Sequence, residues 1–477
     1  MKQECNVEII RMLVDYVSRL DYATACFASL TSRGVAVLPI GKTLRILSLF
    51  AAAASLVLCS SKGQGSLSLD RDRMLGILDQ VSKEIEKNYY DRNLKGLDWK
   101  GLTAQAKQQI EKANTPGEMI TAIFVLVDKL QDSHTVFVPP PRVAAVLFGF
   151  EAKSFGNQIL VYKIRKKGAA EAAGLQLGDR ILTVNGFNAD PRTWDLMMEY
   201  LRVLRPVSAM EMGIIRGNEA PQKLLVTGKI DSGRKLWDLT DIDTIFQFIH
   251  DEEANTDSDD EKYRYQLDPA GIGYIQLRAF IGNEEFLDRL VGKIKNARAT
   301  IVDLRGNLGG AETTLLSTVG HFQSEPAAIL EVVGRKKTET LQAKPRKPIL
   351  EGPMFILVDS ETASSAEIFA RHFQLASRAK VIGDHTSGRV LRGQYFSRKM
   401  GADIAVLYGI NISVGRGLLP GGEDLEKRGV TPDVTCIPTA EQLKAGQDVC
   451  RAMAHTMAQV ALGLPARQDD KIEQKNP

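Results

Sequence analysis

The N-terminal third of the chain carries apolar residues at helical spacing. Between residues 74 and 85 they follow one another at three- and four-residue steps, the period of an amphipathic helix. Thr115 and Pro116 then predict the start of a second helix, because threonine is a good N-cap and proline suits the first helical turn. The apolar positions are Met74, Ile77, Leu78, Val81 and Ile85 in the first helix, and Ile120, Ile123, Phe124, Val127 and Leu130 in the second. We therefore predict an N-terminal helical domain over residues 66–140.

The pattern changes over residues 141–232, where short apolar runs are separated by glycines. These runs predict strands at 158–164, 180–184, 209–215 and 223–226, with one helix near 193–204. Residues 168–186 predict a short helix that stops at Gly174, a turn through Gly178 and Asp179, a strand, and a hairpin turn at Asn185-Gly186.

An acidic run at residues 251–261 lies within a predicted linker, residues 233–265. From residue 272 strands alternate with helices, which predicts a mostly parallel sheet covered by helices over residues 266–440. The predicted strands are 273–277, 300–304, 354–358 and 380–383, and the predicted helices are 283–296, 313–322 and 364–375. A C-terminal helix and tail complete the chain at 441–477. In such a sheet the active site gathers at the carboxyl ends of the strands.

Residues 1–65 are predicted to be a leader with a secretory signal. Lys42 and Arg45 precede an uncharged run, residues 46–58, which is short for a membrane span of about 20 residues and typical of the apolar part of a signal peptide. A short buried helix is the alternative. Because little normally precedes such a signal, we expect translation to begin near Val35 or Val37.

Composition excludes several classes of function. Hydrophobic residues make up 44% and charged residues 25%, as in globular proteins, and the net charge is +3. No basic stripe or zinc-finger spacing indicates a nucleic-acid partner, and no cysteine or histidine pattern indicates a metal or another cofactor. Cys59 is a candidate for lipidation, whereas Cys436 and Cys450 either pair in an oxidising compartment or stay unpaired.

Two segments carry candidate chemistry. Ser364 follows a buried strand and a polar turn and opens a helix, where free amides and the helix dipole favour negative charge. It is either a nucleophile or a simple N-cap. Residues 301–310 are a strand followed by a glycine-rich loop, whose backbone amides can hold an anion or stabilise an oxyanion.

Taken together, four motifs resemble the C-terminal-processing (tail-specific) serine peptidase family. They are DLRGNLGG at 303–310, DSETASSAEIFA at 359–370, GVTPD at 429–433, and the PDZ signature at 168–186. The resemblance implies a crotonase-like (ClpP/crotonase-type) α/β catalytic core with an inserted PDZ domain at 141–232, and peptide hydrolysis without a metal. It implies Ser364 as nucleophile, with Gly309 or Gly310 and the Ser365 amide as oxyanion hole. PDZ domains bind the C-terminus of an extended peptide, and the loop Leu147-Phe148-Gly149-Phe150 is the candidate carboxylate-binding loop.

One position departs from the family. Many members carry a lysine base 25 residues after the serine, where this chain has Arg389, and arginine does not lose its proton in proteins. Asp132-Ser133-His134-Thr135 instead resembles the histidine segment of the tricorn-protease and retinoid-binding-protein branch of the superfamily. That resemblance implies His134 as base, with His385 as an alternative. Glu426 is the expected orienting acid, and Glu423 and Asp424 are alternatives.

We therefore expect an exported serine peptidase of the periplasm or cell envelope, acting on peptides or protein C-terminal tails. Its mature chain should have no integral membrane domain. Arg389 and His385 are possible substrate contacts, and glycine-rich residues 415–422 suggest a mobile loop beside the acid. The alternatives are a catalytically inactive PDZ protein that binds peptides, and a crotonase-type acyl-thioester enzyme.

Overall fold

The structure is a computed structural model that describes residues 67–140, 145–204, 207–231, 263–282, 284–400 and 406–465. The described residues from Asp70 onward belong to one compact unit, which holds every element discussed below apart from the first three residues of the N-terminal helix. The predicted leader, the signal run and Cys59 lie outside the described residues. Among the described residues, no helix combines the length and apolar character needed to cross a membrane.

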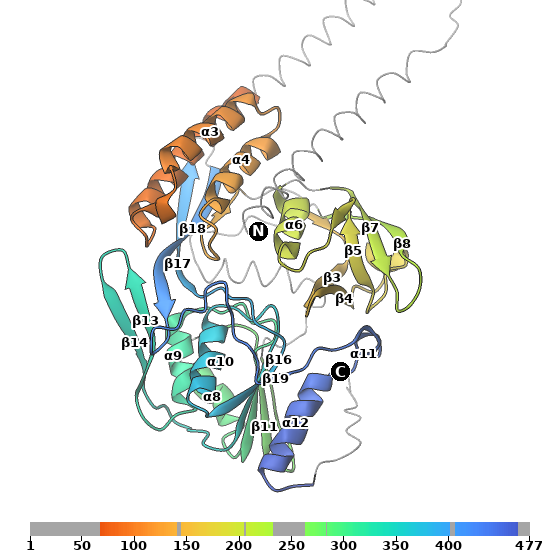
Figure 1. Ribbon diagram of the computed structural model, residues 1–477, viewed down its shortest axis with the longest axis vertical. Coiled ribbons are helices and arrows are strands. Elements are labelled where there is room, and N and C mark those ends of the chain that lie inside the picture. Colours follow the sequence, from red (N-terminus) through yellow and green to blue (C-terminus); the bar gives the residue numbers. More distant parts are fainter. Residues whose placement is uncertain are drawn as a thin grey trace, which may run out of the picture. The chain divides into compact units, whose positions relative to one another are not determined.

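Three helices form the N-terminal part of this unit. Two of them, at 67–88 and 116–128, confirm the helices predicted from the sequence. The helix at 67–88 buries Met74, Ile77, Leu78, Val81 and Ile85. It is followed by the short turn Leu94–Gly96 and by α3 (Trp99–Lys112). The next helix, α4 (Pro116–Asp128), is capped by Thr115, whose hydroxyl accepts a hydrogen bond from the Glu118 amide. Helices α3 and α4 lie side by side at one end of the described unit (Figure 1).

A small antiparallel sheet follows, in the order β3-β4-β5-β7-β8, with β6 beside β5 and a separate pair β2-β9. Its turns are those predicted: Asn185 and Gly186 both have positive φ, 51° and 82°, in the hairpin between β5 and β6. The strands are β2 (Ala145–Leu147), β3 (Phe150–Phe155), β4 (Gln158–Ile164), β5 (Arg180–Val184), β6 (Phe187–Asn188), β7 (Ala209–Ile215), β8 (Gln222–Thr227) and β9 (Lys229–Asp231). The helices are α5 (Ala169–Ala172) and α6 (Trp194–Glu199), the latter continued by a π turn at Tyr200–Leu204.

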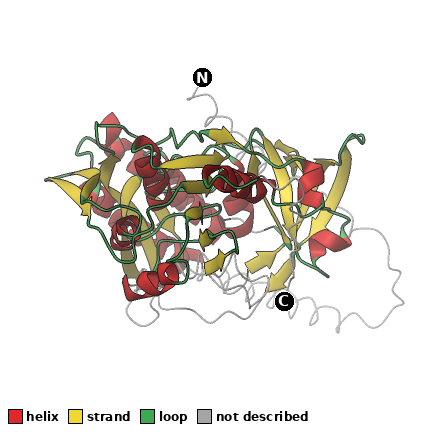
Figure 2. Ribbon diagram, turned by 90° about the horizontal axis from the view of Figure 1, so that it is seen from below, coloured by secondary structure: helices red, strands yellow, loops and turns green. Residues whose placement is uncertain are grey.

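The C-terminal half is built on a six-stranded sheet of order β10-β11-β12-β15-β16-β19, parallel except for the edge strand β10. Helices α8, α9 and α10 cover one face and α12 covers the other (Figure 1), and Figure 2 shows these strands and helices from below. The strands are β10 (Tyr263–Leu267), β11 (Ile272–Leu277), β12 (Ala299–Asp303), β15 (Met354–Val358), β16 (Ala379–Gly383) and β19 (Val434–Thr435). The helices are α8 (Glu284–Gly292), α9 (Glu312–Gly320), α10 (Ser365–Leu375), α11 (Ala440–Lys444) and α12 (Val449–Ala461). The predicted alternation of strands and helices is confirmed.

A second, antiparallel sheet was not predicted. It consists of β1 (Val136–Val138), β18 (Val406–Leu418), β13 (Ala327–Gly334) and β14 (Thr338–Ala343), with β17 (Leu391–Met400) also paired to β18. The prediction of a mobile loop at 415–422 is wrong for residues 415–418, which belong to β18. Glycine serves close packing there, because a Cβ at Gly415 would lie 2.5 Å from the Val332 side chain.

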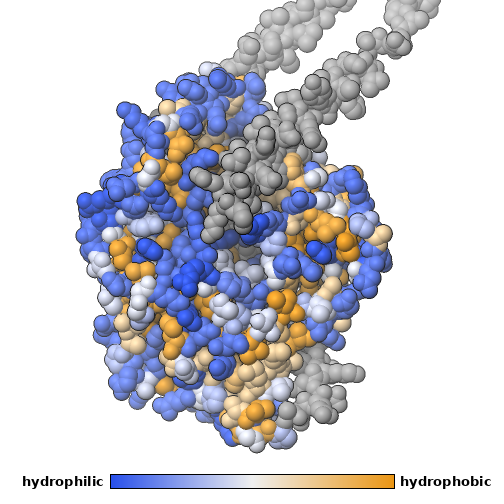
Figure 3. Space-filling view, viewed as in Figure 1, coloured by the Kyte–Doolittle hydropathy of each residue, from blue (hydrophilic) through white to orange (hydrophobic). Residues whose placement is uncertain are grey.

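The underside of the parallel sheet is closed by α12. Its residues Ala454 and Ala458 pack with Ile301, Phe355 and other buried side chains of the strands. On its outer side Met453 and Val460 are exposed, and Figure 3 shows an apolar area where α12 lies.

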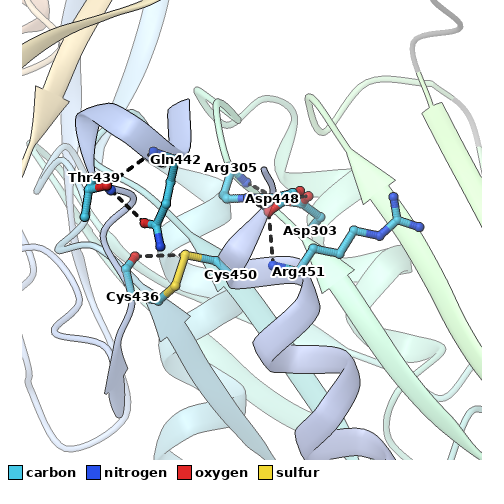
Figure 4. The surroundings of a disulfide bond; sticks show 8 residues. All are labelled: Asp303, Arg305, Cys436, Thr439, Gln442, Asp448, Cys450 and Arg451. Carbon is cyan, nitrogen blue, oxygen red and sulfur yellow. Dashed lines mark hydrogen bonds and ion pairs between the residues drawn. A yellow bond between two sulfur atoms is a disulfide. The ribbon is translucent and has the colours of Figure 1, made fainter. Parts of the chain in front are cut away.

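Cys436 and Cys450 form a disulfide with a Cα–Cα distance of 5.7 Å, which joins the segment after β19 to α12 (Figure 4). This decides between the two states that the sequence left open. Beside it, Asp448 caps α12 and binds Arg305, which also binds Asp303.

Candidate active site

Ser364 occupies a sharp turn between β15 and α10. Its backbone angles, φ 55° and ψ −123°, lie in a region that non-glycine residues rarely adopt. The Ser364 amide donates to the Glu367 carboxylate at 3.0 Å. The turn therefore presents a half-buried serine at the N-terminus of α10, held by its own helix.

The glycine loop after β12 packs directly against this serine. A Cβ on Gly309 would lie 2.6 Å from the Ser364 Cβ, so any side chain at that position would displace one of the two segments. Asn307 holds the loop, because its side chain donates to the Leu277 carbonyl and accepts from the Gly309 amide, both at 2.8 Å. Sequence reasoning missed this role of Asn307, although the residue lies inside the DLRGNLGG motif.

The hydrogen bond that the Gly309 amide donates to Asn307 narrows the choice among the three predicted oxyanion-hole donors. The Gly309 amide is already engaged, whereas Gly310 presents its carbonyl, not its amide, to the Ser365 hydroxyl at 3.0 Å. Ser365 is the first residue of α10, and the first amides of a helix have no partner within it. Of the three predicted donors, the Gly310 and Ser365 amides are the better candidates.

His134 lies two residues before β1, and the Ser133 hydroxyl lies between its ring and Glu426. The Ser133 hydroxyl lies 2.7 Å from His134 Nδ1 and donates to Glu426 Oε2 at 2.8 Å. The Ser133 amide also donates to Glu426, at 3.1 Å. Because the Ser133 hydroxyl donates its hydrogen bond to Glu426, its oxygen is free to accept a hydrogen bond from Nδ1–H of His134. In that tautomer Nε2 carries the lone pair. Sequence reasoning expected direct orientation by the acid and missed Ser133.

The electrostatics keep this histidine neutral. Removal from water is the largest influence and lowers the pKa of His134 to about 4, against the opposing effect of Asp132; the positive charge of Arg389 lowers it further. Burial raises the pKa of Glu426, and hydrogen bonds from Val390 and Ser133 oppose the rise. At neutral pH the His134 ring is therefore uncharged, with the Ser133 hydroxyl between it and Glu426.

Asp132 fixes the turn that carries the histidine. Its carboxylate accepts from the His134 and Thr135 amides at 3.0 and 2.7 Å, and from the hydroxyls of Thr135, Tyr89 and Ser413. Burial alone would raise the pKa of Asp132, but these hydrogen bonds and Lys95 outweigh it and lower the pKa. The turn is anchored to the N-terminal helices and to β18 at once.

The two alternative acids are engaged elsewhere. Glu423 forms a two-fold ion pair with Arg371, at 2.9 and 3.0 Å. Asp424 binds Arg416 at 2.6 Å. Of the three acids considered, Glu426 is the one that reaches Ser133.

The other two predicted contacts lie on the loop after β16. The Arg389 guanidinium donates to Asp195 of α6 at 2.9 Å, and its amide donates to Glu367. His385 is exposed, and its Nδ1 lies 3.0 Å from the Thr386 carbonyl. Neither side chain has a hydrogen bond to Ser364 among those of the described residues.

The predicted carboxylate-binding loop lies between β2 and β3. Gly149 has φ 77°, and the carbonyls of Phe148 and Gly149 accept from the Ala170 and Arg165 amides. The outer edge of β3, where a peptide strand would add, is partly engaged in this structure. The Ala152 carbonyl accepts from the Trp194 indole at 2.7 Å, and the Ser154 carbonyl accepts from the Ser360 hydroxyl at 2.6 Å.

The serine and histidine segments are joined through one strip of backbone, residues 388–390. The Gly388 and Arg389 amides donate to Glu367, which holds Ser364, and the Val390 amide donates to Glu426, which holds Ser133. Within the described residues, no hydrogen bond joins the His134 ring to the Ser364 hydroxyl directly; such bonds are often long before substrate binds.

Three family models match the chain. Residues 271–436 match peptidase family S41, residues 71–123 match the tricorn protease C1 domain, and residues 145–211 match the PDZ domain. The S41 match contains the glycine loop, Ser364 and Glu426. The tricorn C1 match ends shortly before His134.

Curated relatives have related names. The chain is 24% identical over 295 residues to carboxyl-terminal-processing peptidase 1, chloroplastic, of Arabidopsis thaliana, a match covering 59% of this chain and 53% of that protein. It is 26% identical over 377 residues to the carboxyl-terminal-processing protease of a Synechocystis strain, covering 75% and 79%. The chain thus spans about half the length of the first relative and most of the second.

The solved structure of mature CPAF is similar in fold. It aligns with a TM-score of 0.62 at 12% identity, covering 83% of this chain and 98% of that one. The chain therefore contains a peptidase S41 domain, a tricorn protease C1 segment and a PDZ domain, and its sequence is similar to that of carboxyl-terminal-processing proteases.

Proposed function

We propose that the chain hydrolyses peptide bonds with Ser364 as nucleophile, His134 as general base and acid, and Glu426 as the orienting acid that acts through Ser133. The observation that carries the proposal is the hydrogen-bond series from His134 through Ser133 to Glu426. It supplies a neutral histidine in a chain that has arginine at the family's lysine position.

In the first step, His134 Nε2 takes the Ser364 proton as the hydroxyl oxygen attacks the peptide carbonyl carbon. The amides of Gly310 and Ser365 receive the developing oxyanion. The imidazolium, stabilised by Ser133 and the Glu426 carboxylate, then gives its proton to the departing amine as the C–N bond breaks. Water, deprotonated by the same histidine, releases the acyl group as a carboxylic acid and restores Ser364. In this scheme the neighbouring Arg389 charge favours neutral His134 between steps.

We infer that the substrates are peptides or protein C-terminal tails. The support is the PDZ match with its loop Leu147–Phe150, together with the printed names of the relatives. A crotonase-like architecture for the catalytic core, behind an N-terminal helical domain, agrees with the parallel sheet and with the position of the nucleophile at the end of β15.

We also propose export to the periplasm or cell envelope. The Cys436–Cys450 disulfide supports an oxidising compartment, and the apolar run at 46–58 supports a secretory signal. A lipid anchor at Cys59 stays a prediction from the sequence.

Labelling by a fluorophosphonate tests the chemistry. Wild-type protein should be labelled covalently, while Ser364→Ala and His134→Ala should not, because the probe needs both an activated hydroxyl and its base. Undiminished labelling of Ser364→Ala, or no labelling of folded wild type, would reject the proposed mechanism.

A further inference from the structure

Glu367 is a fully buried carboxylate that the catalytic scheme above does not use. It lies in the first turn of α10, three residues after the nucleophile, with an exposed fraction of 0%. A buried carboxylate is costly unless its oxygens are well hydrogen-bonded, so its partners indicate what it stabilises.

Four donors converge on this carboxylate. Oε2 accepts from the amides of Ser364 at 3.0 Å and Arg389 at 2.9 Å. Oε1 accepts from the Thr386 hydroxyl at 2.5 Å and the Gly388 amide at 2.7 Å. All four donors are uncharged groups. The Arg389 guanidinium, which could have formed an ion pair with Glu367, is directed to Asp195 instead. The Glu367 carboxyl group is therefore stabilised by hydrogen bonds and by the N-terminus of α10.

The first of these bonds acts on the strained residue. Ser364 has φ 55°, a conformation that costs a non-glycine residue free energy and persists where surrounding contacts enforce it. The bond from its own amide to Glu367 is one such contact. The glycine loop supplies another, since Gly309 leaves no room for a second side chain beside Ser364 Cβ.

The other bonds act on the strip that leads to the base. Thr386, Gly388 and Arg389 are fixed by Glu367, and the next amide, that of Val390, is fixed by Glu426. Glu426 in turn holds Ser133, the hydroxyl beside His134. The buried Glu367 and the half-buried Glu426 thus bind adjacent residues of one backbone strip, Glu367 for the nucleophile and Glu426 for the base.

We propose that Glu367 is a positioning residue that sets the Ser364 hydroxyl in register with His134. It acts through the Ser364 amide and through residues 386–389, and it touches no reacting atom. The inference rests on the proposed function, because it presumes that His134 serves Ser364. A helix-capping role alone would stabilise α10 and leave the chemistry unchanged.

The test compares Glu367→Gln with Glu118→Gln. Glu118 is the matched control, because it occupies the same position of α4, three residues after Thr115, and accepts a backbone amide bond from Asn114 far from Ser364. In Glu367→Gln the shape is kept, but the new NH₂ group faces amide donors. We expect kcat to fall roughly 100-fold, the size of effect that misplacement by about 1 Å produces.

Three readouts separate positioning from capping. The rate of fluorophosphonate acylation should fall with kcat, KM should stay within about threefold, and Glu367→Asp should restore part of the rate by returning the charge. Glu118→Gln should match wild type in all three. Acylation of Glu367→Gln within about threefold of Glu118→Gln would overturn the inference, as would a loss confined to KM.

A second pair of variants covers the case in which Glu367→Gln does not fold. Thr386→Ser keeps the hydroxyl that donates to Glu367, and Thr386→Val removes it. Acylation about tenfold slower in the valine variant than in the serine variant supports the proposal, and equal rates refute it. If wild type is labelled and these variants are labelled equally, the positioning role alone fails. If folded wild type is unlabelled, the proposed function fails with it.

Discussion

Two buried acidic clusters in this protein are stabilised in opposite ways. Beneath the parallel sheet, Asp303 and Asp448 share the Arg305 guanidinium. At the candidate active site, Glu367 and Glu426 accept their hydrogen bonds from amides and hydroxyls. The first cluster contains a cation, whereas the hydrogen-bond donors of the second are uncharged.

The difference appears in the acid–base properties. Burial would raise the pKa of Asp448, but the hydrogen bonds and charge of Arg305 outweigh it and lower the pKa. Burial raises the pKa of both Glu367 and Glu426, and their neutral donors oppose it only in part. An ion pair is suited to holding α12 in place. A carboxylate without a cation is suited to stabilising a positive charge that arises on His134 during the reaction.

Among substitutions in these two clusters, Glu426→Gln is expected to have the largest effect on activity. The amide cannot supply the negative charge, so kcat/KM should fall about 100-fold or more. Glu423→Gln is the matched control, since Glu423 pairs with Arg371 in the same segment. Steady-state kinetics on a peptide substrate measure both. Equal activities would contradict the assignment of the acid.

Opening the disulfide should affect stability and leave the chemistry intact. Cys436 and Cys450 are separated by 14 residues in sequence, and a loop of this size corresponds to about 3 kcal/mol of stabilisation. Cys436→Ala with Cys450→Ala should lower the free energy of unfolding by about that amount in a denaturant titration. The rate of Ser364 acylation at low temperature should stay close to that of the wild type. A large fall in that rate would show that the disulfide and α12 also contribute to catalysis.

A smaller loss is expected from Asp448→Asn. Arg305 keeps Asp303 as a partner, so one charged hydrogen-bond pair is weakened at a cost of about 1–3 kcal/mol. Thermal unfolding measures the loss. A variant as stable as wild type would show that Arg305 gains nothing from its second carboxylate.

The sequence predicted the regions whose patterns are local. Strong alternation from residue 272 predicted the parallel sheet, and Asn185-Gly186 predicted the hairpin turn between β5 and β6 of the small antiparallel sheet, because both residues tolerate positive φ. The second sheet was missed because β17 and β18 contain glycine and charged residues that resemble loop sequence. Their glycines are required by neighbouring side chains, which a single sequence does not reveal.

The same limit applies to the site. Ser364 and His134 were proposed from motifs, whereas Ser133 and Glu367 are an ordinary serine and glutamate until folding brings their hydrogen-bond partners to them. Ser133 meets Glu426 across a sequence separation of 293 residues. Gly309 was grouped with Gly310 because they are the last two residues of the DLRGNLGG motif, and the hydrogen bond from the Gly309 amide to Asn307 distinguishes them.

The pH dependence of Ser364 acylation tests the central claim most directly. The fluorophosphonate rate constant reports the free enzyme, so it follows the titration of the base. Because burial lowers the pKa of His134 to about 4, the account predicts a rate that rises through about pH 4 and is flat from pH 5.5 to 8. It also predicts no labelling of His134→Ala at any pH in this range. A rate that climbs instead through pH 6.5 or above, or an unchanged profile in His134→Ala, would contradict a buried neutral histidine as the base.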